Sequence, residues 1–366
     1  MLIISALGIF SINYYIYLRF IAKSRLKRKI KLTILGLLVV LSFTLLLVRW
    51  VVRDLIGSTV FDVFAPSLCF MMVFFLTLFS VSIAADLILL PLVGFKRKKL
   101  VNPYYQTVLF LCAAALTVWG QYEGHKIPEV KEVTLKSSLI REPVKIALMS
   151  DLHITRVTDI ERVKKIVAEI NDLHADVIVL AGDILDDEIK HIIKIAQPLK
   201  NLRAPLGVYY VTGNHEYYLN VNDAEELIKQ IGIPQLENRG VQLREDLYIA
   251  GVPDRKQGPK FMHDFDPDAA LADASERQFK ILVSHQPVEN DSASLVLSGH
   301  THGGQMLPFQ LISPLYNSGM LSGLYGSKDR YIYISNGAGS WGPQLRVLAP
   351  YDISLVTVEP DQNGGS

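Results

Sequence analysis

Five short apolar runs in the last two thirds of this 366-residue chain each lead directly into Asp, Asn or His. Runs of this length that are bounded by turn residues are typical of buried strands. The polar residues that follow them are Asp151 and His153, then Asp183, then Asn214 and His215, then His285, and finally His300 and His302. A turn would explain one polar strand end, but five indicate donors clustered at one edge of a sheet, at the carboxyl ends of its strands.

The last of these ends, residues 298–305, carries two histidines one residue apart, followed by paired glycines. Residues i and i+2 of an extended chain point to the same side, so His300 and His302 are expected to converge. Such a pair suits one metal ion or a bridge between two, and two polar loop histidines are the alternative interpretation. The remaining four histidines lie in polar segments and are interpreted as surface residues: His125, His174, His191 and His263.

Helical and strand patterns alternate through the same region. Apolar spacing predicts helices over residues 159–173, 188–199 and 224–231. Further short strands are predicted at 241–243, 247–252 and 330–334, and an edge strand at 132–136. Strand–helix alternation that gives way to strands predicts an α/β sandwich with two facing sheets and flanking helices.

The order of the polar clusters resembles a known family. Asp-x-His, Gly-Asp, Gly-Asn-His-Glu, a lone His and Gly-His-x-His are similar to the signature of the calcineurin-like metallophosphoesterases, over about residues 130–358. The sequence Gly-His-Thr-His-Gly-Gly-Gln, with residues 335–339 and 343–346 after it, resembles the bacterial YkuE-like branch. The resemblance implies a four-layer α/β/β/α sandwich that holds two divalent metal ions. Oxygen and nitrogen donors without thiolate fit Mn, Zn or Fe.

The resemblance also implies a role for each residue. Asp183 would bridge the two ions, and a bridging hydroxide would attack phosphorus. The other ligands divide into Asp151, His153 and His302 at one ion, and Asn214, His285 and His300 at the other. His215 would protonate the leaving oxygen or steady the transition state.

Two further residues are candidates for binding the substrate. Arg346 could bind a phosphate as a bidentate hydrogen-bond donor, and a surface charge is the alternative. Glu216 could orient His215, and a solvated carboxylate is the alternative.

The first third of the chain differs in composition. The chain is 50% hydrophobic, and the excess lies in four apolar runs at residues 2–18, 32–48, 60–93 and 104–119. A membrane span needs about 20 apolar residues, so the middle two runs are long enough and the outer two are marginal. We expect about four transmembrane helices in 1–120, a linker with the edge strand in 121–143, the metallophosphoesterase domain in 144–358 and a disordered tail in 359–366. A cleavable signal peptide is disfavoured, because no basic segment precedes the first run.

Basic residues between the apolar runs predict their orientation. Residues 19–31 carry seven Lys and Arg and residues 96–99 carry four, without an acidic residue in either segment. The positive-inside bias places both segments in the cytoplasm, which puts the catalytic domain on the extracytoplasmic side of the cell membrane. Asp86, inside the third run, is either a functional ionisable group or close enough to the end of the run to reach the interface. Both cysteines, Cys69 and Cys112, lie in apolar runs, where neither a disulfide nor a reactive thiol is expected.

These patterns together predict a membrane-anchored, two-metal phosphoester hydrolase, acting as a phosphodiesterase or phosphatase on a lipid-linked or nucleotide-type substrate. The expected partners are the lipid bilayer and the phosphoester, and a net charge of +1 gives no indication of nucleic acid. The alternatives are a UDP-diacylglucosamine-type pyrophosphate hydrolase, a non-catalytic metal-binding receptor module, and a transporter with an appended enzyme. An apolar segment with Tyr316, Leu321, Leu324 and Tyr325 is expected to touch acyl chains or the membrane surface.

Overall fold

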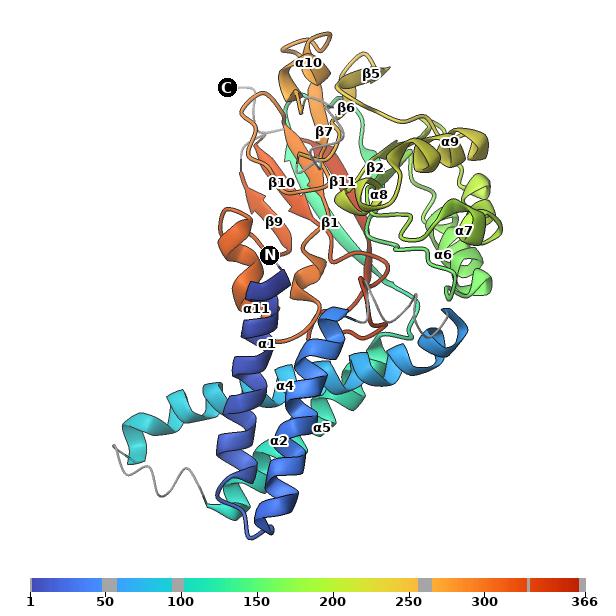
Figure 1. Cartoon of the computed structure of the whole chain (residues 1–366). Coiled ribbons are helices and arrows are strands. Elements are labelled where there is room, and N and C mark those ends of the chain that lie inside the picture. The colour runs from blue at the N-terminus through green and yellow to red at the C-terminus, as the bar shows by residue number, and fades with distance from the viewer. Residues whose placement is uncertain (1, 48–57, 94–101, 256–264, 328–329, 362–366) are drawn as a thin grey trace. The chain divides into compact units, whose positions relative to one another are not determined.

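The computed structural model of the chain describes residues 2–47, 58–93, 102–255, 265–327 and 330–361 (Figure 1). The chain divides into two compact units. The first comprises Met1–Glu123 with Met306–Pro308, and the second comprises Gly124–Gln305 with Phe309–Ser366. The strands of the predicted sandwich all lie in the second unit.

Two mixed sheets form the second unit (Figure 1). The first has the order β1 (Glu129–Ser137), β11 (Asp352–Pro360), β2 (Val144–Met149), β3 (Val177–Ala181) and β4 (Val208–Val211). The second has the order β5 (Arg239–Arg244), β6 (Leu247–Gly251), β7 (Phe279–Val283), β8 (Leu295–Ser298), β10 (Tyr331–Ile334) and β9 (Gly323–Gly326). Strands β2, β3 and β4 are parallel, and so are β6, β7 and β8. Within each parallel set the carboxyl ends lie together, which is where ligands bind in such sheets.

Alternation along the strands divides their side chains between two cores. On β2, Val144 and Ile146 pack in a core that also contains Ile249 and Phe279 of the second sheet. Met149, at the end of the same strand, belongs instead to the core beneath the helices. Because successive side chains of a strand point to opposite faces, one strand contributes to both cores.

Helices cover the outer face of each sheet. The helices α6 (Ile160–Asp172), α7 (Ile189–Ala196) and α9 (Val221–Ile231) share a core with the first sheet. Helix α10 (Pro267–Leu271) packs on the second sheet. The layers therefore follow the order helix, sheet, sheet, helix, and the second unit is an α/β fold.

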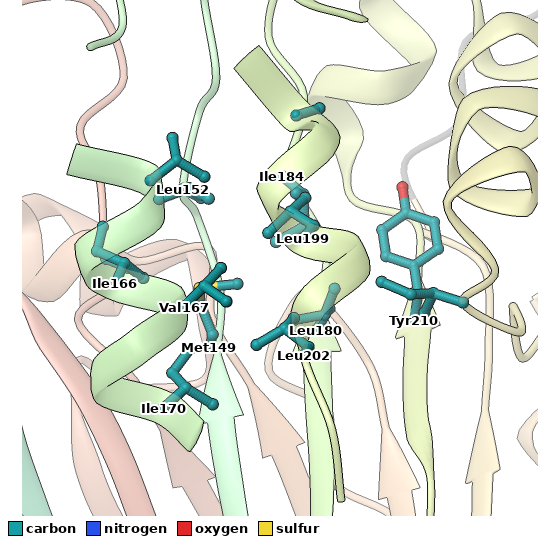
Figure 2. Packing of buried hydrophobic residues seen from close by; sticks show 14 of the residues in the cluster. Met149, Leu152, Ile166, Val167, Ile170, Leu180, Ile184, Leu199, Leu202 and Tyr210 are labelled. Carbon is teal, nitrogen blue, oxygen red and sulfur yellow. The ribbon is translucent and has the colours of Figure 1, made fainter. Parts of the chain in front are cut away.

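Helix α6 illustrates how the sequence produces this packing. Its first turn is capped by Asp159, whose side chain accepts a hydrogen bond from the backbone N–H of Glu161. Its buried residues recur at helical spacing, and Ile166, Val167 and Ile170 lie over the strands in Figure 2. The predicted helix at 159–173 is confirmed within one residue at each end.

Other boundaries differ from the prediction. Helix α9 begins at Val221 rather than at residue 224, and it ends before Gly232, whose φ is 90°. The segment predicted at 188–199 is α7 followed by a 3-10 helix at Gln197–Asn201. Strand β1 lies at the edge of its sheet, as predicted for the linker, and pairs in parallel with β11. Strand β11 takes in residues 359 and 360 of the predicted tail, and residues 362–366 of that tail lie outside the described part of the chain.

The first unit contains α1 (Leu2–Ile16), a π-helical turn η1 (Tyr17–Ile21), α2 (Arg28–Leu47), α4 (Ser58–Val93) and α5 (Pro103–Glu123). Each predicted apolar run coincides largely with one of these helices. Among the described residues, one helix, Ser67–Leu89, is long and apolar enough to cross a membrane, and Leu7–Ile21 is a shorter apolar helix. This finding does not support a bundle of four transmembrane helices, which stays a prediction.

Four helix ends of the first unit meet at the same place. Arg19, just after α1, forms an ion pair with Asp86 near the end of α4. The hydroxyl of Tyr105, at the start of α5, donates to Asp86 over 3.0 Å. Lys31, at the start of α2, donates to the carbonyl of Ala22 over 2.8 Å. The basic segment 22–31 therefore lies at this end.

Replacing Ile166 by Ala is expected to lower the free energy of unfolding by about 2–5 kcal/mol, because the side chain is fully buried and its removal leaves a cavity. Urea unfolding of the full chain in mild detergent measures the change. Glu169→Ala, on the exposed face of the same helix, is the control and should change the value by about 0.5 kcal/mol or less. Equal losses in both variants would contradict the packing described.

Candidate metal centre

The predicted ligands follow strands of both sheets. Asp151 and His153 follow β2, Asp183 follows β3, and Asn214 begins the short helix α8 (Asn214–Tyr218) after β4. From the second sheet, His285 follows β7, while His300 and His302 follow β8. The sequence patterns predicted donors along one edge of one sheet. That prediction is wrong in this respect, because three strands of one sheet and two of the other supply them.

Several of these residues have an unusual backbone conformation. Asp151, His153, Asp183, His300 and His302 all have φ between 49° and 70°. Positive φ is uncommon outside glycine, costs about 1–3 kcal/mol per residue, and clusters at functional sites. The surrounding structure therefore holds five donors in conformations that the isolated chain would avoid.

Two glycines let the backbone approach these donors. A Cβ atom on Gly213 would collide with the carboxylate of Asp183, and one on Gly299 would collide with the carboxylate of Asp151. Both glycines are thus required by close approach to a donor side chain.

The first cluster of donors contains Asp151, His153 and His302, whose ligand atoms lie within 4.8 Å of one another. His302 Nε2 is 3.1 Å from Asp151 Oδ1. His153 Nε2 is 3.1 Å from His302 Nε2. All three residues are buried. Two imidazole nitrogens and a carboxylate oxygen converge on one point, as they would around a single cation.

The second cluster contains Asp183, His285 and His300, again within 4.8 Å. Asp183 Oδ2 lies 3.1 Å from His285 Nε2 and 3.9 Å from His153 Nε2 of the first cluster. Asp183 therefore stands between the two clusters. The side-chain oxygen of Asn214 is buried and has no hydrogen-bond partner within the described ranges of the chain. A buried and unsatisfied amide oxygen at the end of β4 fits a ligand to a divalent metal ion.

The charges of the two clusters differ. Burial lowers the pKa of His302 to about 4, in spite of Asp151, so this imidazole is neutral as a metal ligand must be. Burial also opposes the charged form of His285, but Asp183 raises the pKa of His285 well above its usual value. Because a ligand imidazole must be deprotonated, an ion bound at the second cluster would displace any proton on His285.

Asp186 is a functional residue that the sequence patterns did not identify. Its carboxylate lies 3.1 Å from Nδ1 of His153 and 2.7 Å from Nδ1 of His215. Burial opposes charge on His215, but the bond to Asp186 and the charge of Asp183 raise the pKa of His215 to about 9. One carboxylate thus orients a candidate metal ligand and keeps its neighbour protonated at neutral pH. A carboxylate three residues after Asp183, in the same strand-end loop, was the available signal.

Glu216 has a different role from the one predicted. It is fully buried, and it accepts backbone N–H bonds from Asp183, Ile184, Leu185 and Gly213 over 2.8–3.1 Å. These bonds tie the loop after β3 to the loop after β4. Glu216 therefore fixes the backbone of the site and neither orients His215 nor lies where substrate could reach it.

Arg346 also lies behind the site. Its side chain is fully buried and stacks over the ring of Tyr351 at 4.5 Å. One guanidinium nitrogen donates to the carbonyl of His302 over 2.7 Å, and another lies 3.0 Å from Nδ1 of that imidazole. The buried guanidinium therefore holds His302 from the side away from the cluster, a position that fits neither the predicted contact with a phosphate nor the alternative of a surface charge.

The four histidines interpreted as surface residues differ in exposure. His125 and His174 are exposed, His191 is half-buried, and His263 lies outside the described residues. Both cysteines are free, and Cys112 is exposed while Cys69 is half-buried.

The comparisons with known proteins agree with this site. The family model for calcineurin-like phosphoesterases matches residues 144–304, the segment from β2 to the loop of His302. An uncharacterized metallophosphoesterase of Campylobacter jejuni is 30% identical over 367 aligned residues, covering 95% of each chain. The uncharacterized metallophosphoesterase YkuE of Bacillus subtilis is 32% identical over 68% of this chain and 93% of its own. A transmembrane protein with metallophosphoesterase domain from Danio rerio is 30% identical over 70% of this chain and 63% of its own.

The fold and the donor clusters define a metallophosphoesterase. This chain belongs to the calcineurin-like metallophosphoesterase family. It is a phosphoric ester hydrolase, and its family uses divalent metal ions.

Asp186→Asn should lower the pKa of His215 in the metal-free protein from about 9 toward its usual value of about 6.5, because the amide no longer stabilises the imidazolium. NMR titration of the His215 ring, with the His174 ring as an internal control, measures the change. An unaltered His215 titration would contradict the role given to Asp186.

Proposed function

We propose that this chain hydrolyses phosphoesters with two divalent metal ions held at the shared carboxylate of Asp183. Asp151, His153 and His302 would hold one ion, and Asn214, His285 and His300 the other. The observation that carries the proposal is the pair of buried donor clusters on either side of Asp183. Bound ions would neutralise the charge of the phosphoester and activate a water for attack. Nitrogen and oxygen donors favour Mn, Zn or Fe.

His215 is placed to supply the proton that the leaving oxygen needs. Its side chain is 12% exposed, whereas those of His153 and Asp183 beside it are 0% and 2% exposed. Asp186 occupies its Nδ1, which leaves Nε2 as the nitrogen available for proton donation. A protonated imidazole in this position can contribute about 10²–10⁴-fold to the rate as a general acid.

We further propose that the first unit anchors the enzyme in the cell membrane by several spans. The apolar helix Ser67–Leu89 supports at least one span. Large apolar side chains also lie exposed on four helices of this unit, including Leu37, Leu87 and Val108 at 64%, 65% and 55%. Surfaces of this kind suit a lipid environment. The basic segment at the shared helix ends favours a cytoplasmic position for that end, and hence an extracytoplasmic catalytic domain.

The exposed surface near the site supports a lipid-linked substrate. Residues 303–327, directly after His302, contain no charged residue. Within them, α11 (Phe309–Ile312) and the next turn (Ser313–Tyr316) expose Leu311, Leu315 and Tyr316 at 75%, 80% and 71%. Thr301, between the two ligand histidines, bonds to the carbonyl of Leu321 over 2.6 Å, which ties this apolar segment to the metal loop.

The reaction is tested with the full chain in detergent on a chromogenic phosphodiester and the matching monoester. His215→Ala should lower kcat about 10²–10⁴-fold through loss of the general acid. Asp183→Asn should lose activity together with bound metal, because the shared carboxylate is gone. His174→Ala is the control and should retain full activity. Chelation should abolish turnover and added Mn²⁺ or Zn²⁺ restore it, whereas turnover that survives chelation would overturn the proposal.

The apolar surface is tested by replacing Leu311, Leu315 and Tyr316 together with Ser. Activity on a phosphoester embedded in vesicles should fall, while activity on a small soluble diester should be spared, because only the first requires contact with acyl chains. Ile193→Ser, which changes a partly exposed apolar residue on α7, is the control. An equal loss on both substrates would contradict a role in lipid contact.

A further inference from the structure

A bonded polar cluster lies among the apolar helices of the first unit. The guanidinium of Arg19 pairs with both carboxylate oxygens of Asp86 and also donates to the hydroxyl of Tyr15 over 2.7 Å. It reaches Gln106 over 3.3 Å, and Tyr105 completes the shell of Asp86. Asp86 is thus satisfied within the helices. Ionisable residues in such helices are expensive to bury and commonly mark functional sites.

The backbone is also irregular at this cluster. Arg19 lies in η1, where the N–H of Ala22 bonds to the carbonyl of Tyr17, five residues earlier, over 2.8 Å. Single π-helical turns inside helices occur frequently at functional sites. The irregular turn and the ion pair therefore point to the same end of the unit.

A hollow of about 550 Å³ borders this cluster. Its apolar wall is formed by residues of α1, η1, α2, α4 and α5: Ile16, Phe20, Leu38, Phe75, Leu78 and Phe110. Its polar edge contains Arg19, Lys23, Gln106 and Thr107. The volume lies within the range of about 300–1,000 Å³ that is usual for ligand sites. An elongated apolar group with a polar end suits such a space.

The charges at the polar edge favour a ligand whose polar end is anionic. The positive charge of Arg19 is balanced by Asp86. Lys23 is exposed at the hollow, and the segment 22–31 that contains it carries six Lys and Arg with no acidic residue. An anionic group beside Lys23 would gain favourable charge interactions that a neutral or zwitterionic group would lack.

We propose that this hollow binds an acyl chain of an anionic phospholipid, with the lipid phosphate beside Lys23. The inference rests on the proposed membrane insertion of the first unit and is independent of the hydrolytic reaction. The basic end is the end assigned to the cytoplasm, and the cytoplasmic leaflet is the anionic one. The bound lipid is therefore a ligand that joins α1, α2, α4 and α5 around the ion pair, and it is distinct from the substrate.

The test measures Tm of the purified full chain in neutral detergent, because a ligand of the folded state raises Tm as its concentration rises. The probes are dioleoylphosphatidylglycerol, dioleoylphosphatidylcholine and glycerol 3-phosphate. We expect the anionic lipid to raise Tm in a saturable way, the zwitterionic lipid to raise it less at equal concentration, and the soluble phosphate to leave it unchanged.

Two variants locate the effect. Lys23→Gln should weaken the apparent Kd for the anionic lipid about fivefold, the loss expected for one lysine near a lipid headgroup. Lys29→Gln removes an exposed lysine of the same segment that does not line the hollow, and it should change that Kd less than twofold. Thr107→Trp should fill the hollow and abolish binding of both lipids. If the tryptophan variant does not fold, the pair of lysine variants still decides the matter.

Three outcomes would overturn the site: equal stabilisation by the two lipids, equal losses in the two lysine variants, or full stabilisation by glycerol 3-phosphate. Failure of the anchor itself is distinguished by carbonate extraction of membranes. A chain released into the soluble fraction would remove the premise, whereas a chain retained in the pellet without lipid-dependent Tm would refute the lipid site alone. Neither outcome alters the phosphodiesterase assay.

Discussion

Two buried carboxylates, Asp151 and Asp183, set the main physical constraint on this fold. Both are almost completely shielded from water, at 0% and 2% exposure. A buried charge without partners costs several kcal/mol, so the surrounding chain must compensate it. His302 and His285 supply part of that compensation at 3.1 Å each. Backbone N–H groups of His300 and His215 supply more, at 3.0 Å and 2.8 Å. The positive-φ conformations of these loops allow backbone N–H groups and imidazoles to reach the carboxylates of Asp151 and Asp183 together.

The strand ends and their donors could be predicted because their signals are local. A short apolar run followed by Asp-x-His or Gly-Asp needs only a few residues to be recognised, and the order of the clusters is visible in the sequence. The division between two sheets could not be predicted in the same way, since strand order depends on contacts between distant segments. β11 inserts between β1 and β2 although it is the last strand in the chain, and no local pattern specifies that position.

The roles of Asp186, Glu216 and Arg346 show the same limit at the level of single side chains. Each is a charged residue next to a recognisable motif, where sequence favours contact with substrate or solvent. In the structure each is directed inward, toward a candidate ligand imidazole or toward backbone N–H groups. Whether a charge faces the reaction or supports the residues around it depends on burial, which single-sequence spacing does not encode. The helices of the first unit were predictable from hydropathy, but the pairing of Arg19 with Asp86 was not, because the two lie 67 positions apart.

The shared use of Asp186 has a thermodynamic consequence. Its two oxygens bond to His153, a proposed metal ligand, and to His215, the proposed acid. Coordination at His153 would strengthen the pull of its Nδ1–H on the carboxylate and so leave less negative charge to hold the proton on His215. Coupling between two binding events is reciprocal. Protonation of His215 and metal binding at the first cluster are therefore linked. The pKa of His215 would then report whether the first cluster holds a metal ion.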